Sequence, residues 1–216
     1  MPNSAPAAAP ACSPAYPPGT VRALLDTDQV TPPTRRALRA RLDDARGDDR
    51  RPLFFGDVEY ATLRAACARL APPPGRTRPV PLAACVDARL AGGAGDGWRY
   101  AALPPDPRAY VLGLRGLDEH ALDAFGAPFA RLDGAAQDAV LGAVQRGAAR
   151  GDAWHALPAA RFFEELLAEV AECYYSHPLA QEEIGYAGMA DAPGWRAVGL
   201  DRLEAREPRA AETADA

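Results

Sequence analysis

Residues 161–178 read RFFEELLAEVAECYYSHP, and this stretch decides the fold class. Its apolar side chains recur every three or four positions, which is the spacing of one face of an α-helix. Acidic residues fill the other positions, so the stretch predicts an amphipathic helix that opens after Pro158 and stops at Pro178. The apolar positions are Phe162, Phe163, Leu166, Leu167, Val170, Cys173 and Tyr174.

The same helical period continues upstream, between proline-rich connectors. One helix is predicted over 34–46, and four more are predicted to begin near Asp57, Pro81, Asp106 and Asp133. The prolines at 72–74 and the glycine-rich stretch at 92–97 are predicted to be breaks between helices. No segment alternates like a strand, and Ile184 is the only isoleucine. The sequence therefore predicts an all-α helical bundle with long Gly- and Pro-rich loops.

The chain has 216 residues, enough for one sizeable core. Residues 1–19 are rich in proline and alanine, and we expect a disordered tail there. A single helical domain is predicted over 20–200. Residues 201–216 are charged and are predicted to form a second disordered tail.

The stretch that follows Pro178 combines glycines with large apolar residues. Gly185, Gly188, Gly194 and Gly199 would lose backbone entropy on ordering. The same stretch nevertheless carries Ile184, Tyr186, Trp195 and Leu200. Apolar anchors on a flexible backbone indicate a loop that packs against another surface.

At these residues the chain resembles the gluconate 2-dehydrogenase subunit 3 family, the small subunits of flavin-dependent sugar and polyol dehydrogenases. The resemblance covers roughly residues 30–207, although none of its motifs is as specific as a metal or phosphate signature. Upstream it includes Phe54 with Phe55 and the segment from Tyr110 to Leu117. The residues that carry it near the C-terminus are Phe162 with Phe163, Tyr174 with Tyr175, Ser176, Pro178, Gly185, Gly194 with Trp195, and Gly199.

The resemblance implies a non-catalytic accessory subunit that binds and stabilises a larger FAD-dependent oxidoreductase of the glucose–methanol–choline (GMC) type. A sugar-like alcohol would then be oxidised on the FAD of the partner, and this chain would hold no cofactor. The alternative is a stand-alone helical scaffold, or a small helical enzyme with an unrecognised site.

The predicted partner-binding residues surround the end of the helix and the loop after it. Tyr175 points about 100° away from Tyr174, because neighbouring helix positions diverge, and so it suits a second surface. Tyrosine and tryptophan are enriched at interfaces. Core packing is the alternative for Phe163, Tyr174 and Trp195. The predicted set is Tyr175, His177, Pro178, Ile184, Tyr186 and Trp195.

Charge and motifs exclude several other functions. The 24 basic residues are all arginines, are interspersed with acids and leave a net charge of −5, so nucleic acid is an unexpected partner. No apolar run reaches the length of a membrane span. No G-x-G-x-x-G, Walker loop or G-x-S-x-G elbow is present.

Histidine and cysteine spacing gives little support for a metal. His120 and His155 read as surface or packing residues. His177 could stabilise the C-terminal end of the preceding helix through the helix dipole. With Cys173 and nearby acids it could instead form a metal site, but a lone C-x-x-x-H is a weak signal.

Cys67, Cys85 and Cys173 each lie on the apolar face of a predicted helix, so we expect buried free thiols. A Cys67–Cys85 disulfide remains an alternative. Reduced thiols would suit the cytoplasm. The first twenty residues lack the basic start and the apolar core of a secretory signal. Arg35 and Arg36 are similar to a twin-arginine export motif, but the pair is internal and is followed by charged residues instead of an apolar stretch. A cytoplasmic protein is therefore predicted.

Overall fold

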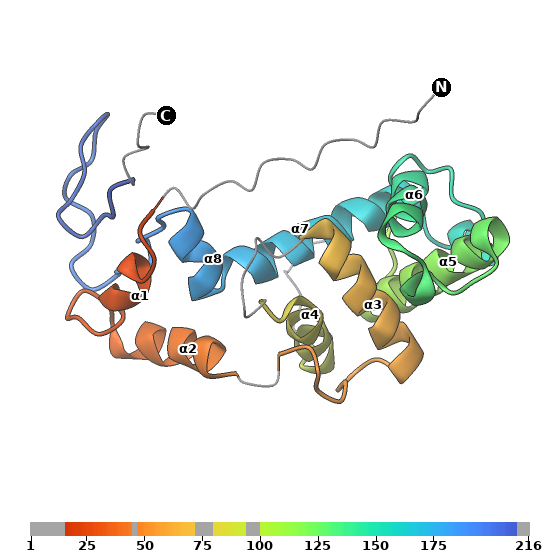
Figure 1. Cartoon of the computed structure of the whole chain (residues 1–216), viewed down its shortest axis with the longest axis horizontal. Helices are drawn as coiled ribbons and strands as arrows, with labels where there is room; N and C mark the ends of the chain where they lie inside the picture. The colour runs from red at the N-terminus through yellow and green to blue at the C-terminus, as the bar shows by residue number, and fades with distance from the viewer. Residues whose placement is uncertain (1–15, 45–46, 72–79, 94–99, 211–216) are drawn as a thin grey trace, which may run out of the picture. The chain divides into compact units, whose positions relative to one another are not determined.

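The computed structural model describes residues 16–44, 47–71, 80–93 and 100–210. In these ranges the chain forms eight α-helices and two short 3-10 helices, with no strand (Figure 1). The predicted all-α fold is therefore confirmed. The predictions for residues 1–15, 72–79, 94–99 and 211–216 lie outside the described residues.

The contacts divide the chain into two compact units, where the sequence predicts one domain over 20–200. Unit 1 contains described residues 16–44 and 176–210, and unit 2 contains 47–71, 80–93 and 100–175. The helices of unit 1 are α1 (Thr20–Leu24), α2 (Pro32–Asp43) and α8 (Pro178–Glu183). Those of unit 2 are α3 (Asp57–Leu70), α4 (Leu82–Ala91), α5 (Asp106–Phe125), η1 (Phe129–Arg131), α6 (Gly134–Gln145), η2 (Asp152–His155) and α7 (Ala159–Tyr175).

Local signals placed most helix starts within two residues. Asp133 caps α6 as predicted, because its side chain accepts the N–H of Ala136 at 2.9 Å. Asp57 is the first residue of α3 and not its N-cap. The cap is Gly56, whose N–H binds the Glu59 carboxylate at 2.9 Å. Pro178 does not lead directly into a loop, since proline suits the first turn of a helix and here starts α8.

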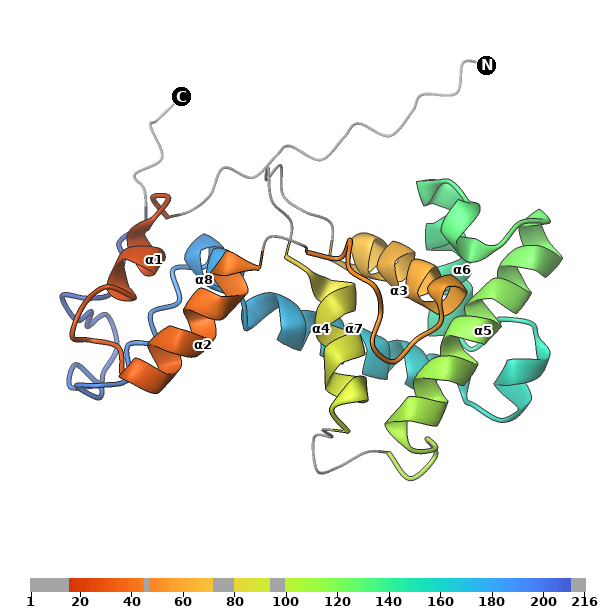
Figure 2. The same cartoon turned by 90° about the horizontal axis from the view of Figure 1, so that it is seen from below.

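Unit 2 is a bundle in which α3 packs against α4, α5 and α6, and α7 packs against α4 and α6 (Figures 1 and 2). Glycines in α5 allow close approach of aromatic rings from later segments. A Cβ on Gly113 would lie 2.1 Å from the Phe162 ring, and one on Gly116 would lie 2.5 Å from Trp154. Phe162 is fully buried and meets Tyr110 edge to face at 5.9 Å.

Largely buried charges join the helices of unit 2. Arg89 of α4 binds Asp106 at 2.9 Å and Glu169 at 2.7 Å, and so links α4 to α5 and α7. Burial alone would lower the pKa of Arg89, but the two carboxylates raise it. In addition, the buried carboxylate of Asp87 accepts three successive backbone N–H groups at 2.6–3.1 Å and fixes the turn before α3. The donors are Leu53, Phe54 and Phe55.

A disulfide joins Cys85 of α4 to Cys173 of α7, with 6.1 Å between their Cα atoms. The expectation of free thiols is therefore wrong for these two residues, and the alternative Cys67–Cys85 pair is also wrong. Cys67 is buried and free, as predicted. The error arises because Cys85 and Cys173 are 88 residues apart, so only the packing of α4 on α7 brings them together.

Candidate partner-binding surface

Unit 1 has a small core of its own, built from α1, α2 with the residues just before it, and the segment after α8. Its buried members are Val21, Leu25, Val30, Leu38, Met189 and Ala190. Because α1 and α8 are only five and six residues long, they depend on this core and on the polar contacts below for their order. The apolar segment after α8 thus packs partly on its own chain.

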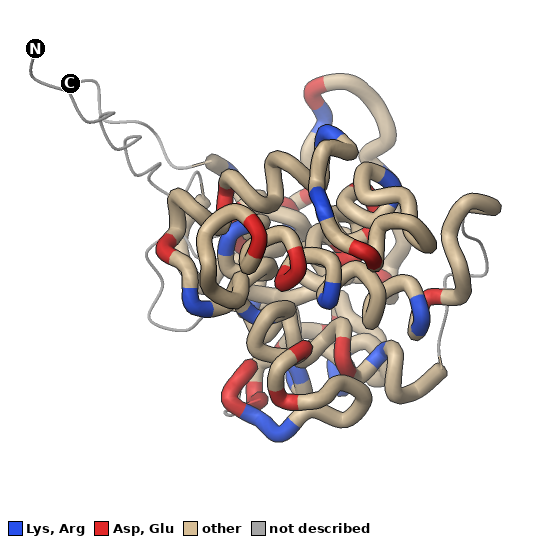
Figure 3. The backbone as a smooth tube through the Cα atoms, turned by 90° about the vertical axis from the view of Figure 1, so that its right-hand side faces the viewer, with Lys and Arg blue, Asp and Glu red and all other residues tan. Residues whose placement is uncertain are grey.

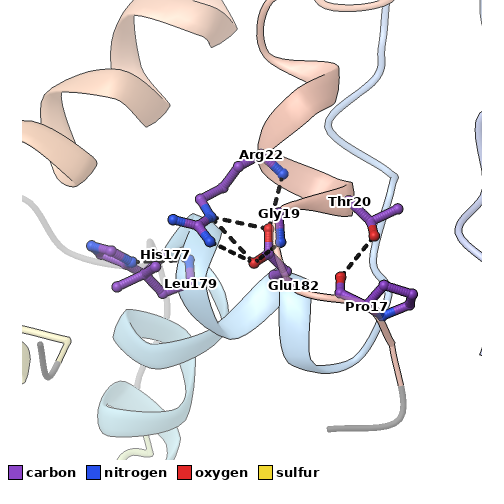
Figure 4. Close-up of polar contacts among 7 residues, drawn as sticks. All are labelled: Pro17, Gly19, Thr20, Arg22, His177, Leu179 and Glu182. Carbon is purple, nitrogen blue, oxygen red and sulfur yellow. Dashed lines mark hydrogen bonds and ion pairs between the residues drawn. The ribbon is translucent and has the colours of Figure 1, made fainter. Parts of the chain in front are cut away.

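Glu182 of α8 holds the first turn of α1 (Figure 4). Its carboxylate accepts the N–H groups of Gly19 at 2.6 Å and Arg22 at 3.1 Å, and pairs with the Arg22 guanidinium at 2.9 Å. Burial alone would raise the pKa of Glu182, but the hydrogen bonds from Arg22 and Gly19 outweigh it and lower the pKa below its usual value. Glu182 is thus an internal cap rather than an exposed charge.

Asp191 holds the start of α2 in a similar way, by accepting hydrogen bonds from its first residues. Its two carboxylate oxygens accept the N–H and the hydroxyl of Thr31 and the hydroxyl of Thr34, each at 2.8 Å. These hydrogen bonds lower the pKa of Asp191 to about 2. The carboxylate lies at the positive end of the α2 dipole, where negative charge is stabilised.

His177 caps the start of α8 rather than the end of α7, so the predicted dipole role is corrected. Its Nδ1 accepts the N–H of Leu179 at 3.2 Å, and its Nε2 lies 3.2 Å from the carbonyl oxygen of Arg41. Both contacts are satisfied by a neutral ring with the proton on Nε2. The Arg41 guanidinium also donates to the Ser176 carbonyl. His177 therefore connects α2 to α8 inside unit 1.

The metal alternative around His177 has lost two of its ligands. Cys173 is bonded to Cys85, and Glu182 is engaged by α1. In the part of the chain that the structure describes, no group of three or more His, Cys, Asp or Glu side chains is arranged to hold a metal ion.

Four of the six predicted partner-binding side chains are about half exposed. Tyr175 is 49% exposed, Ile184 47%, Tyr186 49% and Trp195 46%. Tyr175 belongs to unit 2 and the other three belong to unit 1, so they form two separate sets. His177 and Pro178 are buried and offer little area to a partner. Both residues belong to the predicted set, and they are buried because they form the N-cap and the first residue of α8.

The exposed fractions also distinguish core packing from surface exposure for Phe163, Tyr174 and Trp195. Phe163 is 8% exposed and belongs to the core, whereas the exposed Trp195 does not. Tyr174 is half-buried and contacts the more exposed Tyr175 edge to face at 5.1 Å. The divergence of neighbouring helix positions thus separates the two tyrosines as predicted.

The structure adds apolar residues that the predicted set omits. Val198 is 79% exposed, Leu200 94% and Leu203 60%. Val198 and Leu200 end the glycine-rich stretch after Pro178, where apolar anchors are predicted, whereas Leu203 lies in the charged stretch that is predicted to be a tail.

The family model described as "Gluconate 2-dehydrogenase subunit 3" matches residues 57–194, more than half of the chain. The chain belongs to the gluconate 2-dehydrogenase subunit 3 family. The matched range includes all of α3 to α8 and three of the four exposed predicted residues, and it ends one residue before Trp195. Comparisons with curated proteins and with solved structures each gave no match.

The surface of this subunit 3 protein is mixed in charge. On the side drawn in Figure 3, basic and acidic positions are interspersed along the tube. No helix in the described ranges is both long and apolar enough to cross a membrane.

A cleft of about 640 Å³ in unit 2 lies beside η2 and is lined by Arg150, Trp154 and His155, among others. Arg150 in this cleft has structural partners: its guanidinium pairs with Asp123 at 3.6 Å, and its backbone N–H binds His120 Nδ1 at 3.2 Å. Burial lowers the pKa of His120. These contacts fix the loop between α6 and η2 to α5, and none of the predicted partner-binding residues lines the cleft.

Proposed function

We propose that this subunit 3 protein is a non-catalytic accessory subunit that binds and stabilises a larger FAD-dependent oxidoreductase of the GMC type. The single observation that carries the proposal is the family match over 57–194. The name of that family is the name of a dehydrogenase subunit. Exposed aromatic residues within and just after the matched range support a role in binding another protein.

In the proposed complex the chemistry belongs to the partner. A sugar or other polyol would lose hydride to the FAD of the large subunit, and this chain would hold no cofactor. The accessory subunit would act by mass action, because any ligand that binds only the folded state of its partner raises the stability of that partner.

Tyr175, Ile184, Tyr186 and Trp195 are the proposed anchors. Each presents a large apolar area with few rotatable bonds, which reduces the entropy lost on binding. Anchors near the centre of an interface typically cost about 2 kcal/mol or more when truncated, whereas charges at the rim cost little.

Co-expression with a flavoprotein encoded by the adjacent reading frame, followed by purification through a tag on one chain, tests the proposal. We expect the two chains to purify together, and we expect Tyr175→Ala and Trp195→Ala to weaken the complex. Glu182→Ala is not a suitable control, because Glu182 caps α1. The exposed Glu172, on the same helix as Tyr175, provides the polar control Glu172→Ala, and Leu122→Ala provides an apolar one that is 50% exposed before substitution.

If the flavoprotein purifies alone and its stability is unchanged by this chain, the accessory function is wrong and the stand-alone scaffold becomes the better account. Equal loss of binding in the two control variants would show that Tyr175 and Trp195 have no special role.

The location of the complex belongs to the same proposal. The sequence predicts the cytoplasm, whereas the Cys85–Cys173 disulfide is typical of an oxidising compartment. Extraction of the protein from its native cells, with thiols trapped by alkylation, distinguishes a cytoplasmic location from an oxidising compartment. A cytoplasmic protein would show both cysteines alkylated.

A further inference from the structure

The two cysteines of the Cys85–Cys173 disulfide lie in different surroundings. Cys173, on α7, is only 5% exposed. Cys85, on α4, is exposed, and Ala88, one turn later on the same helix face, is exposed too and carries only a methyl group. A dissolved molecule therefore reaches the disulfide from the side of Cys85 and not from the side of Cys173.

Access decides which sulfur of a disulfide reacts. A disulfide is opened by a thiolate that attacks one of its two sulfurs and forms a mixed disulfide. Attack at Cys85 Sγ forms a new S–S bond to the attacking thiol and breaks the bond to Cys173. The electron pair of the broken bond leaves on Cys173 Sγ, which takes up a proton from water in place of the proton that the attacking thiol has lost. The products are a mixed disulfide at Cys85 and a thiol at Cys173.

The surroundings of Cys173 favour the thiol over the thiolate. Glu169 Oε1 lies 3.9 Å from Cys173 Sγ, and it also accepts the Nε–H of Arg89 at 2.7 Å. A thiol donates weakly to such a carboxylate, whereas a buried thiolate would be repelled by it and would lack water. Since only the thiolate attacks a disulfide, the freed Cys173 is slow to displace the thiol bound at Cys85. The mixed disulfide is therefore expected to persist.

The disulfide also holds the end of α7. Cys173 lies in the last turn of that helix, residues 172–175, whose carbonyl groups have no further helical turn to accept from. The Arg89–Glu169 ion pair, one turn earlier, does not depend on the disulfide. Opening of the bond thus acts mainly on the last turn, which ends with the half-exposed Tyr175.

We propose that Cys85 is a site of thiol–disulfide exchange with low-molecular-weight thiols, and that reaction there releases the last turn of α7 from α4. The site goes beyond the proposed accessory function, because the exchange requires only this chain and a dissolved thiol. It gives the chain a covalent modification site on α4 whose effect is felt on α7.

Mapping of the bound thiol tests the position of the site. The full chain carries Cys12→Ser, because Cys12 lies outside the described residues, and is incubated with reduced glutathione and quenched in acid. Mass spectrometry then identifies the peptides that carry glutathione. We expect glutathione on Cys85 at least about tenfold more often than on Cys173, since access selects the sulfur that is attacked. In denaturant both sulfurs are accessible, and the ratio should fall to about one.

Two single variants separate the two sulfurs. Cys173→Ser leaves a thiol at Cys85, and Cys85→Ser leaves a thiol at Cys173. With oxidised glutathione, we expect the first variant to take up glutathione at least about tenfold faster than the second. Cys67 is the internal control: it is 2% exposed, burial raises the pKa of its thiol, and it should stay unmodified in both variants.

Hydrogen exchange measures the effect on α7. In the chain that carries glutathione on Cys85, we expect the amides of residues 172–175 to exchange at least about tenfold faster than in the disulfide-bonded chain, because a helix end without its cross-link frays. The amides around Phe162 are the control. Phe162 packs closely on Gly113 near the other end of α7, and exchange there should not change.

Three results would contradict the proposal. An even distribution of glutathione over Cys85 and Cys173 in the folded chain, or uptake by Cys67 at the rate of Cys85, would show that exchange requires unfolding and would overturn the site. A disulfide that reacts only in denaturant would overturn it as well, since Cys85 would then be inert in the folded chain. Selective uptake at Cys85 with unchanged hydrogen exchange at 172–175 would overturn the release of α7.

Discussion

Four carboxylates cap helices that are distant from them in sequence. Glu182 and Asp191 satisfy N–H groups at the starts of α1 and α2, more than 150 residues earlier. In unit 2, Asp48 accepts the N–H of Ala84 at 2.8 Å in the first turn of α4, whose N-cap is a proline. The Asp118 carboxylate accepts the N–H of Phe129, the first residue of η1, at 2.9 Å. The first N–H groups of a helix need partners, and here the partners come from other elements.

Asp191 should make the stability of unit 1 depend on pH. Its pKa is about 2 in the folded chain against 3.8 for an unperturbed aspartate, so its stabilising contribution is present above pH 3.8 and is lost as pH falls toward 2. We expect Asp191→Ala to lower Tm at pH 7 and the difference from wild type to shrink below pH 3.8. A difference that stays constant from pH 7 to pH 2.5 in calorimetric scans would contradict this assignment.

Gly113 should be intolerant of the usual helix-stabilising substitution. Glycine to alanine inside a helix normally gains up to about 1 kcal/mol. At Gly113, however, the new methyl group would lie 2.1 Å from the buried Phe162 ring, and overpacking of this kind costs about 1–3 kcal/mol.

Gly142 in α6 is the matched control. A Cβ there would meet only the end of the flexible Arg146 side chain, at 3.1 Å. Chemical denaturation should therefore show Gly113→Ala destabilised and Gly142→Ala neutral or stabilised. Two stabilised variants would mean that α5 and α7 are less closely packed at this point.

At the level of elements, α4 and α7 form the most strongly cross-linked pair in unit 2. The Cys85–Cys173 disulfide joins them covalently, and the Arg89–Glu169 ion pair joins them one turn away on each helix. Glu169 Oε1 also lies 3.9 Å from the Cys173 sulfur. The pairing spans the sequence that contains α5, α6 and both 3-10 helices, so it constrains most of the unit.

Removing the disulfide should destabilise the unit substantially. Cysteines 88 residues apart close a long loop, for which the chain-entropy estimate gives about 4.6 kcal/mol. We expect reductant to lower the Tm of wild type and to leave the double variant Cys85→Ser with Cys173→Ser unaffected. Cys67→Ala is the control, because its buried thiol is free and it should respond to reductant like wild type. Wild type with a Tm insensitive to reductant would count against the bond.

At the scale of the whole molecule, the family match spans both compact units, so the shared domain includes α3 to α7 together with α8. The exposed apolar residues from Trp195 onward follow that range. A subunit of this kind is expected to complete its burial only in the presence of another chain, because large exposed apolar groups typically mark interaction sites.

Because the proposed function assigns the FAD to the large subunit, the isolated chain is expected to be colourless and inactive. Purified alone, it should show no flavin absorbance and should not reduce a dye with a sugar as donor. The same assay on the co-expressed complex is the control and should give both signals. Stoichiometric flavin in the isolated chain would assign catalysis to this subunit and refute the accessory role.

The sequence by itself determined most of the helices, but not α1 or α8. The period of residues 161–178, the prolines and the Asp133 cap are local signals, and they placed α2 to α7 to within a few residues. The resemblance carried by Phe162, Tyr175 and Trp195 led to the family that the match confirms. Only the tertiary structure decided that Cys85 meets Cys173, that Glu182 caps α1, that His177 is buried and that Leu200 is exposed. The physical reason is that local periodicity records which face of an element is apolar, whereas pairing and exposure depend on what lies opposite that face, from residues far away in the chain.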